Sequence, residues 1–153
     1  MSVGKALKHE SAVQHVTGKA VYVDDQSRIE GMLSCWPVVV EWARAQIISL
    51  DTKPALDVAG VVTVLTAKDI KGQNQVGTIV PDEVLLPTEE TYYANQAVAW
   101  VVAESEEAAR IGASKVELKT KKLEPIVTIK EAIEKKSFHG NTQRMAKGNP
   151  KKP

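Results

Sequence analysis

The segment that most restricts the fold is residues 97–116, in which an apolar run leads through a short acidic turn into a helix pattern. Residues 97–103 are apolar without interruption and rich in β-branched side chains, which predicts a strand covered on both faces. Ser105 can cap the following helix. Glu106 and Glu107 place negative charge in its first turn, where the helix dipole favours it. The segment therefore predicts a strand followed by a well-marked helix.

The predicted helix has small residues on one face, because Ala108, Ala109, Gly112, Ala113 and Val116 recur at helical spacing. These side chains have almost no height, so the helix backbone can lie close to a sheet. A large side chain at Gly112 would overpack this contact. The whole segment predicts a packing unit and contains no catalytic group.

Length and charge place the chain among single-domain globular proteins. Its 153 residues, 43% apolar and 25% charged, are enough for one domain with a real core. Lysine and arginine number 20 against 19 acidic residues, and aromatic residues make up 5%, which argues against a nucleic-acid partner. The basic clusters, such as Lys119, Lys121 and Lys122, fit a solvated face.

The only cysteine, Cys35, excludes an intramolecular disulfide and favours a cytoplasmic location. Because it stands in an apolar run beside Leu33 and Trp36, we expect its thiol to be buried and inert. The amino-terminal residues lack the apolar core of a signal peptide. No run reaches the length that crosses a membrane, so we expect no membrane association.

Hydrophobic pattern and turn residues predict three parts: an extended lead-in at residues 1–16, a domain at 17–136, and a flexible tail or truncated linker at 137–153. A long loop at 67–87 is typical of functional or partner-facing segments. A short helical turn at 54–58 suggests a crossover connection between two strands. Helices are expected at 106–116 and 129–133. Strands are expected at 20–23, 32–36 (ending at Pro37), 45–50, 61–65, 91–93, 97–103 and 116–119.

The spacing of the histidines is only weak evidence for a metal site. His9, Glu10 and His15 are similar to the zinc motif HExxH, but the spacing has two residues too many and would put the imidazoles on different faces of a helix. A third ligand is also needed, and His139 falls in the predicted tail. We therefore predict no metal site.

Other reactive patterns are also absent. There is no glycine-rich phosphate loop and no GxSxG elbow. Paired carboxylates fit turns and caps, and only Asp82 and Glu83, in the long loop, are candidates for contacting a ligand or partner. We assign no catalytic, cofactor-binding or metal-binding residue.

Six segments of the chain carry a family resemblance when they are taken in order. They read VGKALKHESAVQHVTGKAVYVDD, EGMLSCWPV, ARAQIISLD, GVVTVLTAKDI, GQNQVGTIVPDEVLLP and AVAWVVAESEEAARIGASKVELK. In this order they closely resemble the amino-terminal part of the molybdenum-binding large subunit in the xanthine dehydrogenase and aldehyde oxidase family, known as the α/β hammerhead domain. The resemblance covers about residues 3–140, and the fifth segment is more similar to xanthine dehydrogenases than to carbon monoxide dehydrogenases.

The resemblance implies an α+β hammerhead fold with helices packed on a mixed β-sheet. It also implies an oxidoreductase of purine catabolism or aldehyde oxidation that uses molybdopterin, iron–sulfur clusters and FAD. In that family the catalytic and cofactor-binding residues lie in the large domains after the hammerhead, so we transfer none to this chain. The implied partner is the molybdenum-binding domain or subunit of the same enzyme.

The chain departs from the family in two places. It reads Trp42-Ala43-Arg44-Ala45-Gln46 where the family commonly has a His-Ala-His-Ala-Arg-like stretch, and Asn95-Gln96-Ala97 where the family has Gly-Gln-Pro. Both changes concern contacts with the remaining subunits rather than the fold.

Three hypotheses follow. In the first, the chain is a structural hammerhead unit that acts only with partner chains, and exposed apolar surface such as Trp36 or Trp42 seats against them. In the second, it is a stand-alone binding or scaffold module that kept the fold without the enzyme. Independent catalysis is the third and the least supported by the sequence.

Overall fold

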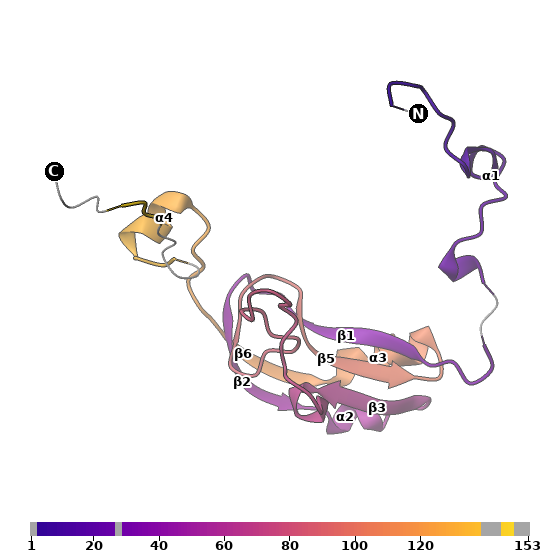
Figure 1. Ribbon diagram of the computed structural model, residues 1–153. Helices are drawn as coiled ribbons and strands as arrows, with labels where there is room; N and C mark the ends of the chain where they lie inside the picture. Colours follow the sequence, from indigo (N-terminus) through magenta and orange to yellow (C-terminus); the bar gives the residue numbers. More distant parts are fainter. Residues whose placement is uncertain (1–2, 27–28, 139–144, 149–153) are drawn as a thin grey trace.

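The computed structural model describes residues 3–26, 29–138 and 145–148. The body of the molecule, residues 34–122, contains two three-stranded sheets (Figure 1). In the first sheet β5 lies between β1 and β3, and in the second β2 lies between β4 and β6. The strands are β1 (Ser34–Val40), β2 (Ala45–Asp51), β3 (Val61–Thr66), β4 (Glu90–Thr91), β5 (Gln96–Ala103) and β6 (Glu117–Lys122).

Two of the four helices of the described residues pack on the body, and the other two lie in two arms of the chain that extend from it. Of these, α3 packs on β1 and β5, and α2 packs on α3 and β3. The arms, residues 3–26 with 29–33 and residues 123–138, extend away from the body in different directions (Figure 1). The helices are α1 (Ala12–Val16), α2 (Lys53–Leu56), α3 (Glu106–Lys115) and α4 (Ile129–Glu134), with short 3-10 turns η1 (Val23–Asp25) and η2 (Ala67–Asp69).

The core forms where α3 lies on β5. Val98, Ala99 and Val101 are at most 1% exposed, as a central strand covered by a helix requires. A Cβ atom at Gly112 would lie 2.8 Å from the Val61 Cγ2 atom and 2.9 Å from the Val101 Cγ1 atom. The small helix face predicted from the sequence is therefore confirmed, because only glycine lets α3 approach this closely.

The α+β fold class is confirmed, and so are most of the predicted elements. The Ser105 Oγ atom accepts a hydrogen bond from the Ala108 N–H at 3.2 Å, as an N-cap should. The elements predicted at 45–50, 54–58, 61–65, 97–103, 106–116, 116–119 and 129–133 appear within a few residues of those positions as β2, α2, β3, β5, α3, β6 and α4. The strand predicted at 91–93 is the shorter β4.

The sheet arrangement differs from the prediction. All strand pairings of the described residues are antiparallel, and the connection through α2 joins β2 of the second sheet to β3 of the first. The expected crossover within one mixed sheet is therefore wrong. Buried apolar strands look the same in parallel and antiparallel sheets, so periodicity could not separate them.

The strand predicted at 20–23 is wrong. The segment has no strand, and Val23–Asp25 forms η1, in which the Asp25 carboxylate accepts a hydrogen bond from the Tyr22 N–H at 2.9 Å. This local bond competes with strand pairing. The lead-in is also not extended throughout, because it contains α1. Of the predicted tail, residues 139–144 and 149–153 lie outside the described residues.

The strand predicted to stop at Pro37 continues to Val40. β1 is an edge strand, and the Val40 carbonyl accepts a hydrogen bond from the Asn95 N–H at 2.7 Å, on the side of β5. Backbone groups alternate along a strand, so the nitrogen of Pro37 faces the free edge, where a proline removes no ladder bond. Edge position explains why proline is tolerated here.

Cys35 is exposed, so the prediction of a buried thiol is wrong. Its side chain lies on the face of the first sheet opposite to α3, directly across from Val102. The apolar neighbours of Cys35 in the sequence alternate between two faces, and only one of these faces is covered by a helix.

Candidate docking groove

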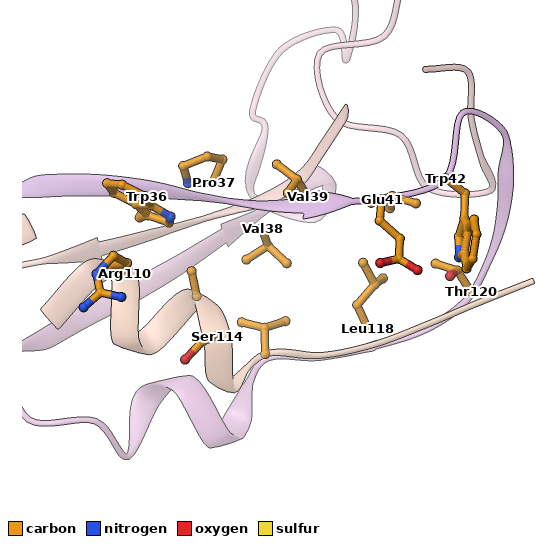
Figure 2. A pocket seen from close by; sticks show the side chains of 13 residues that line it. Trp36, Pro37, Val38, Val39, Glu41, Trp42, Arg110, Ser114, Leu118 and Thr120 are labelled. Carbon is orange, nitrogen blue, oxygen red and sulfur yellow. The ribbon is translucent and has the colours of Figure 1, made fainter. Parts of the chain in front are cut away.

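A groove of about 510 Å³ opens between β1 on one side and α3 and β6 on the other (Figure 2). Its apolar floor includes Val38, Val116 and Leu118. The groove exists because β1 and β6 are edge strands of different sheets, so α3 connects two sheets that do not pair with each other. The groove contains both tryptophans singled out from the sequence.

The two tryptophans stand at opposite ends of the groove. Figure 2 shows Trp36 beside Arg110 and Trp42 beside Thr120. Both tryptophans are half-buried. The Lys122 Nζ atom lies 4.6 Å from the Trp42 ring centroid, a cation–π contact of about 0.5–1 kcal/mol. Trp42 is thus already partly engaged within the chain.

The polar groups of the groove suit binding better than catalysis. Glu41 points its carboxylate between the strands, and Arg110 lies near the other end (Figure 2). The Ser114 hydroxyl donates a hydrogen bond to the Ile111 carbonyl at 2.7 Å. The lining residues include neither histidine nor cysteine. No nucleophile in this lining therefore has a neighbouring histidine base of the kind that nucleophilic catalysis commonly uses.

The structure brings His9 and His15 together, contrary to the expectation from helix geometry. Only His15 lies in α1, so His9 can fold back and the ring centroids are 6.1 Å apart. The His15 Nδ1 atom is 2.8 Å from the Tyr22 hydroxyl. His139 lies outside the described residues. Within the described residues no group of three or more His, Cys, Asp or Glu side chains is placed to hold a metal ion.

Asp82 and Glu83 lie in the long loop, where their backbones form hydrogen bonds with other residues of the loop. The Asp82 N–H donates to the Val80 carbonyl at 3.0 Å, and the Glu83 carbonyl accepts from the Val76 N–H at 2.9 Å. Both side chains are exposed. Their role as contacts to a ligand or partner stays a prediction.

Arg44 is a residue whose role sequence reasoning missed. Its side chain forms an ion pair with Glu90 of β4 and donates to the Glu124 carbonyl at 3.4 Å. The Arg44 carbonyl also accepts a hydrogen bond from the Leu123 N–H at 3.0 Å. The hydrogen bond to Glu90 raises the pKa of the Arg44 guanidinium. Arg44 therefore fixes where the carboxy-terminal arm leaves the body.

The described residues do not fit the cofactors that the resemblance implies for a complete enzyme. Such a group needs metal ligands or polar atoms that face a cavity with their bonding capacity free. Every buried side-chain nitrogen or oxygen of the described residues has a hydrogen-bond partner.

The family model for the aldehyde oxidase and xanthine dehydrogenase a/b hammerhead domain matches residues 17–124. The chain belongs to this family. The hammerhead chain is 41% identical to xanthine dehydrogenase 1 of Arabidopsis thaliana over 149 residues, which are 97% of the chain and 11% of that protein. It is 37% identical to the xanthine dehydrogenase/oxidase of Gallus gallus over 151 residues, 99% of the chain and 11% of that protein.

Solved structures agree with the sequence relatives. The aldehyde oxidoreductase of Desulfovibrio desulfuricans matches the hammerhead chain with a TM-score of 0.75 and 29% identity, covering 85% of the chain and 16% of that structure. The carbon monoxide dehydrogenase of Oligotropha carboxidovorans matches with a TM-score of 0.72 and 33% identity, covering 82% and 16%. These matches confirm the predicted hammerhead fold.

The hammerhead chain spans about 11% of the length of the curated relatives it matches. In those relatives the same fold is therefore one part of a much larger polypeptide. The described residues include no helix with the length and apolar character needed to span a bilayer.

Proposed function

We propose that this hammerhead chain is a structural, non-catalytic part of a xanthine dehydrogenase-type molybdenum hydroxylase and acts with a polypeptide that contains the molybdenum site. The observation that supports this most is that residues 17–124 match this domain, while the alignment of the chain with xanthine dehydrogenase 1 covers only 11% of that protein. The groove of the chain has an apolar floor and no catalytic pair. Its contribution is therefore a shaped surface.

The complete assembly would be a cytoplasmic oxidoreductase that hydroxylates a purine or aldehyde carbon. Molybdopterin, iron–sulfur clusters and FAD would supply its redox chemistry from other domains. Within this chain, residues 17–136 would form the hammerhead unit. Residues 1–16 and 137–153 would connect it to the surrounding polypeptide.

A chimera tests this function. The matching segment of the Arabidopsis thaliana xanthine dehydrogenase 1 is replaced by this chain, and the purified protein is assayed for molybdenum content and xanthine-dependent dye reduction. We expect both to persist, because a structural unit of the same family preserves the surrounding assembly. Loss of both would contradict the proposal. Xanthine-dependent activity of the isolated chain would also contradict it.

The second candidate is a stand-alone scaffold module. It is favoured by the departure at residues 42–46, where Trp42 is in contact with Lys122 and Arg44 forms an ion pair with Glu90 within this chain. A chimera without molybdenum, together with a well-folded isolated chain, would support this alternative.

A further inference from the structure

We infer that the outer face of the first sheet, opposite to α3, is the surface by which this hammerhead domain docks onto the rest of a molybdenum hydroxylase polypeptide. This inference rests on the proposed function and names the contact surface within it. The outer face is defined by the two cross-strand rows Pro37–Trp100–Leu65 and Cys35–Val102–Thr63, together with Val39.

The strand register places apolar side chains next to one another on this face. Trp100 of β5 pairs with Pro37 of β1 and with Leu65 of β3. Trp100 is 38% exposed and Leu65 is 42% exposed. An antiparallel sheet with one face in water normally has polar residues on that face. The composition of the outer face is therefore that of a covered face.

The inner face of the first sheet, on which α3 packs, shows the burial of a cross-strand row that is covered. Val101, one residue along β5 from Trp100, pairs with Trp36 and Val64 and is fully buried beneath α3. Inner and outer rows are similarly apolar. In the outer rows Val102 is 8% exposed, whereas Trp100 is 38% exposed, so this chain covers the outer face only in part. Residues 97–103 thus have the two apolar faces that the sequence predicted, but only one face is fully covered by this chain.

The long loop covers part of the outer face. Leu85 and Leu86 enclose a hollow of about 180 Å³ with Leu65 and Trp100. The loop is held there because the Asn74 side chain donates to the Leu86 carbonyl at 2.7 Å and accepts from its N–H at 2.9 Å. This cover reaches the β3 and β5 part of the face.

The β1 part of the face is left open. Val39 is 41% exposed, and Cys35 is exposed. Figure 2 shows Pro37 and Val39 pointing away from the groove, in the direction opposite to Val38. The loop adds further exposed apolar side chains, including Ile79 at 93% and Leu85 at 51%. Exposed apolar side chains gathered on one face of a sheet mark an interaction site.

The occupant of this surface is apolar and uncharged protein surface from outside the hammerhead. The two rows contain no acidic or basic side chain, which matches the centre of an interface, where charges are depleted. The groove, in contrast, contains Glu41 and Arg110, and its Trp42 is already in contact with Lys122. In the relatives, most of the polypeptide lies outside the matched segment and is available to cover this face.

Cys35 serves as an internal probe of docking. Its thiol is exposed in the isolated chain and lies in the second row of the outer face. In the chimera with the Arabidopsis thaliana xanthine dehydrogenase 1, alkylation of this thiol by iodoacetamide is followed by mass spectrometry of its peptide. We expect alkylation at least about tenfold slower in the chimera than in the isolated chain, because an interface excludes the reagent.

Substitutions provide the second arm. In the chimera, Trp100→Lys should lower molybdenum content and activity by about tenfold or more, as for a central interface residue. The matched control is Tyr93→Lys, at an aromatic residue that is 53% exposed and lies outside both the groove lining and the outer face. It should leave molybdenum content and activity within about twofold, as surface substitutions usually do. Circular dichroism and thermal unfolding of each isolated variant confirm that it folds.

The outcomes separate the two proposals. A wild-type chimera without molybdenum or activity contradicts the proposed function and with it the docking face. An active chimera in which Cys35 is alkylated as fast as in the isolated chain overturns the docking face alone. The docking face is also overturned if the Trp100 variant of the chimera keeps the molybdenum content and activity of the Tyr93 control variant.

Discussion

The helices α3 and α4 begin in the same way and lie in different surroundings. The Ser105 hydroxyl accepts from the Ala108 N–H, and the Thr128 hydroxyl accepts from the Glu131 N–H, both at 3.2 Å. Each helix has acidic residues in its first turn. Yet α3 buries Ala109 and Gly112 against the first sheet, whereas α4 buries none of its residues.

The difference shows that capping starts a helix but burial decides what the helix contributes to stability. In α4, Ile129 is 82% exposed and Ile133 is 59% exposed, although they share a face at i and i+4 spacing. A helix of six residues has only marginal stability when its apolar face is not packed against the rest of the protein. The body should therefore unfold as a unit that depends on α3, and the carboxy-terminal arm should respond separately.

The largest effect is expected for Gly112→Leu in α3. A Cβ atom at this position would already lie under 3.0 Å from Val61 and Val101, so a leucine must force the helix and sheet apart. We expect a loss of about 1–3 kcal/mol in the free energy of unfolding. Urea denaturation followed by circular dichroism measures it.

The control for this prediction is Ser114→Leu, which adds a leucine at an exposed position of the same helix. Surface substitutions usually change the free energy of unfolding by no more than about 0.5 kcal/mol. An unchanged midpoint for Gly112→Leu would show that α3 does not pack as closely as the structure indicates.

The helix cap and the small helix face of α3 could be predicted from the sequence. The order of the strands and the contacts between distant residues could not. Ser105 and Gly112 were identified because caps and small helix faces are short-range patterns. The edge position of Pro37 and the exposure of Cys35 depend on the order of strands in the sheet, which periodicity does not contain. The distant contacts of Arg44, to Glu90 at 46 residues and to Glu124 at 80, leave no local signal.

The same limit applies to the candidate site. The sequence singles out Trp36 and Trp42 as exposed apolar residues, whereas both are half-buried in the structure. The groove between them requires α3 and β6 to lie opposite β1, across about half of the chain. The outer face was hidden for a similar reason, since Pro37, Trp100 and Leu65 become neighbours only through pairing of three strands.

A matched pair of cap substitutions gives the next largest effect. Ser105→Ala should lower the free energy of unfolding of the body by about 1 kcal/mol, because the Ala108 N–H loses its partner at the start of a helix that packs on the first sheet. Thr128→Ala removes the same bond in α4 and should leave the thermal midpoint of the body unchanged. Differential scanning calorimetry compares the two variants. Equal losses would show that α4 is coupled to the core.

Arg44→Ala tests the junction between body and arm. Removing the guanidinium breaks the ion pair with Glu90 and the hydrogen bond to the Glu124 carbonyl. Because these contacts are partly exposed, we expect a loss of at most about 1 kcal/mol. Hydrogen exchange should become faster in residues 123–138.

The control for the junction is Lys135→Ala, which removes only the 2.8 Å bridge from Lys135 to Glu124 within the arm. The Lys135→Ala variant should show the same hydrogen-exchange rates at Leu123 and in β4 as the wild type. If Arg44→Ala also leaves exchange in the arm unchanged, then the arm is held by contacts other than Arg44.

The smallest effect concerns Glu131 and pH. Its side chain accepts hydrogen bonds from the Thr128 hydroxyl at 2.9 Å and from the Thr128 and Val127 N–H groups, and these bonds lower the pKa of its carboxyl. A pKa that is lower in the folded arm than in the unfolded one, where it is roughly 4.3, stabilises α4 above that value. This contribution is lost as the pH falls through the lowered pKa.

The ¹³Cα chemical shifts of residues 129–134, followed from about pH 7 to about pH 2, should therefore report loss of helix in acid while the β5 signals persist. Glu131→Gln should remove this acid step, because glutamine can complete the same capping box without titrating. Glu134→Gln, in the last turn of α4, should retain it. A wild-type α4 whose shifts do not change over this range would show that the arm is held by contacts to the body, and the contrast between α3 and α4 would then be one of degree.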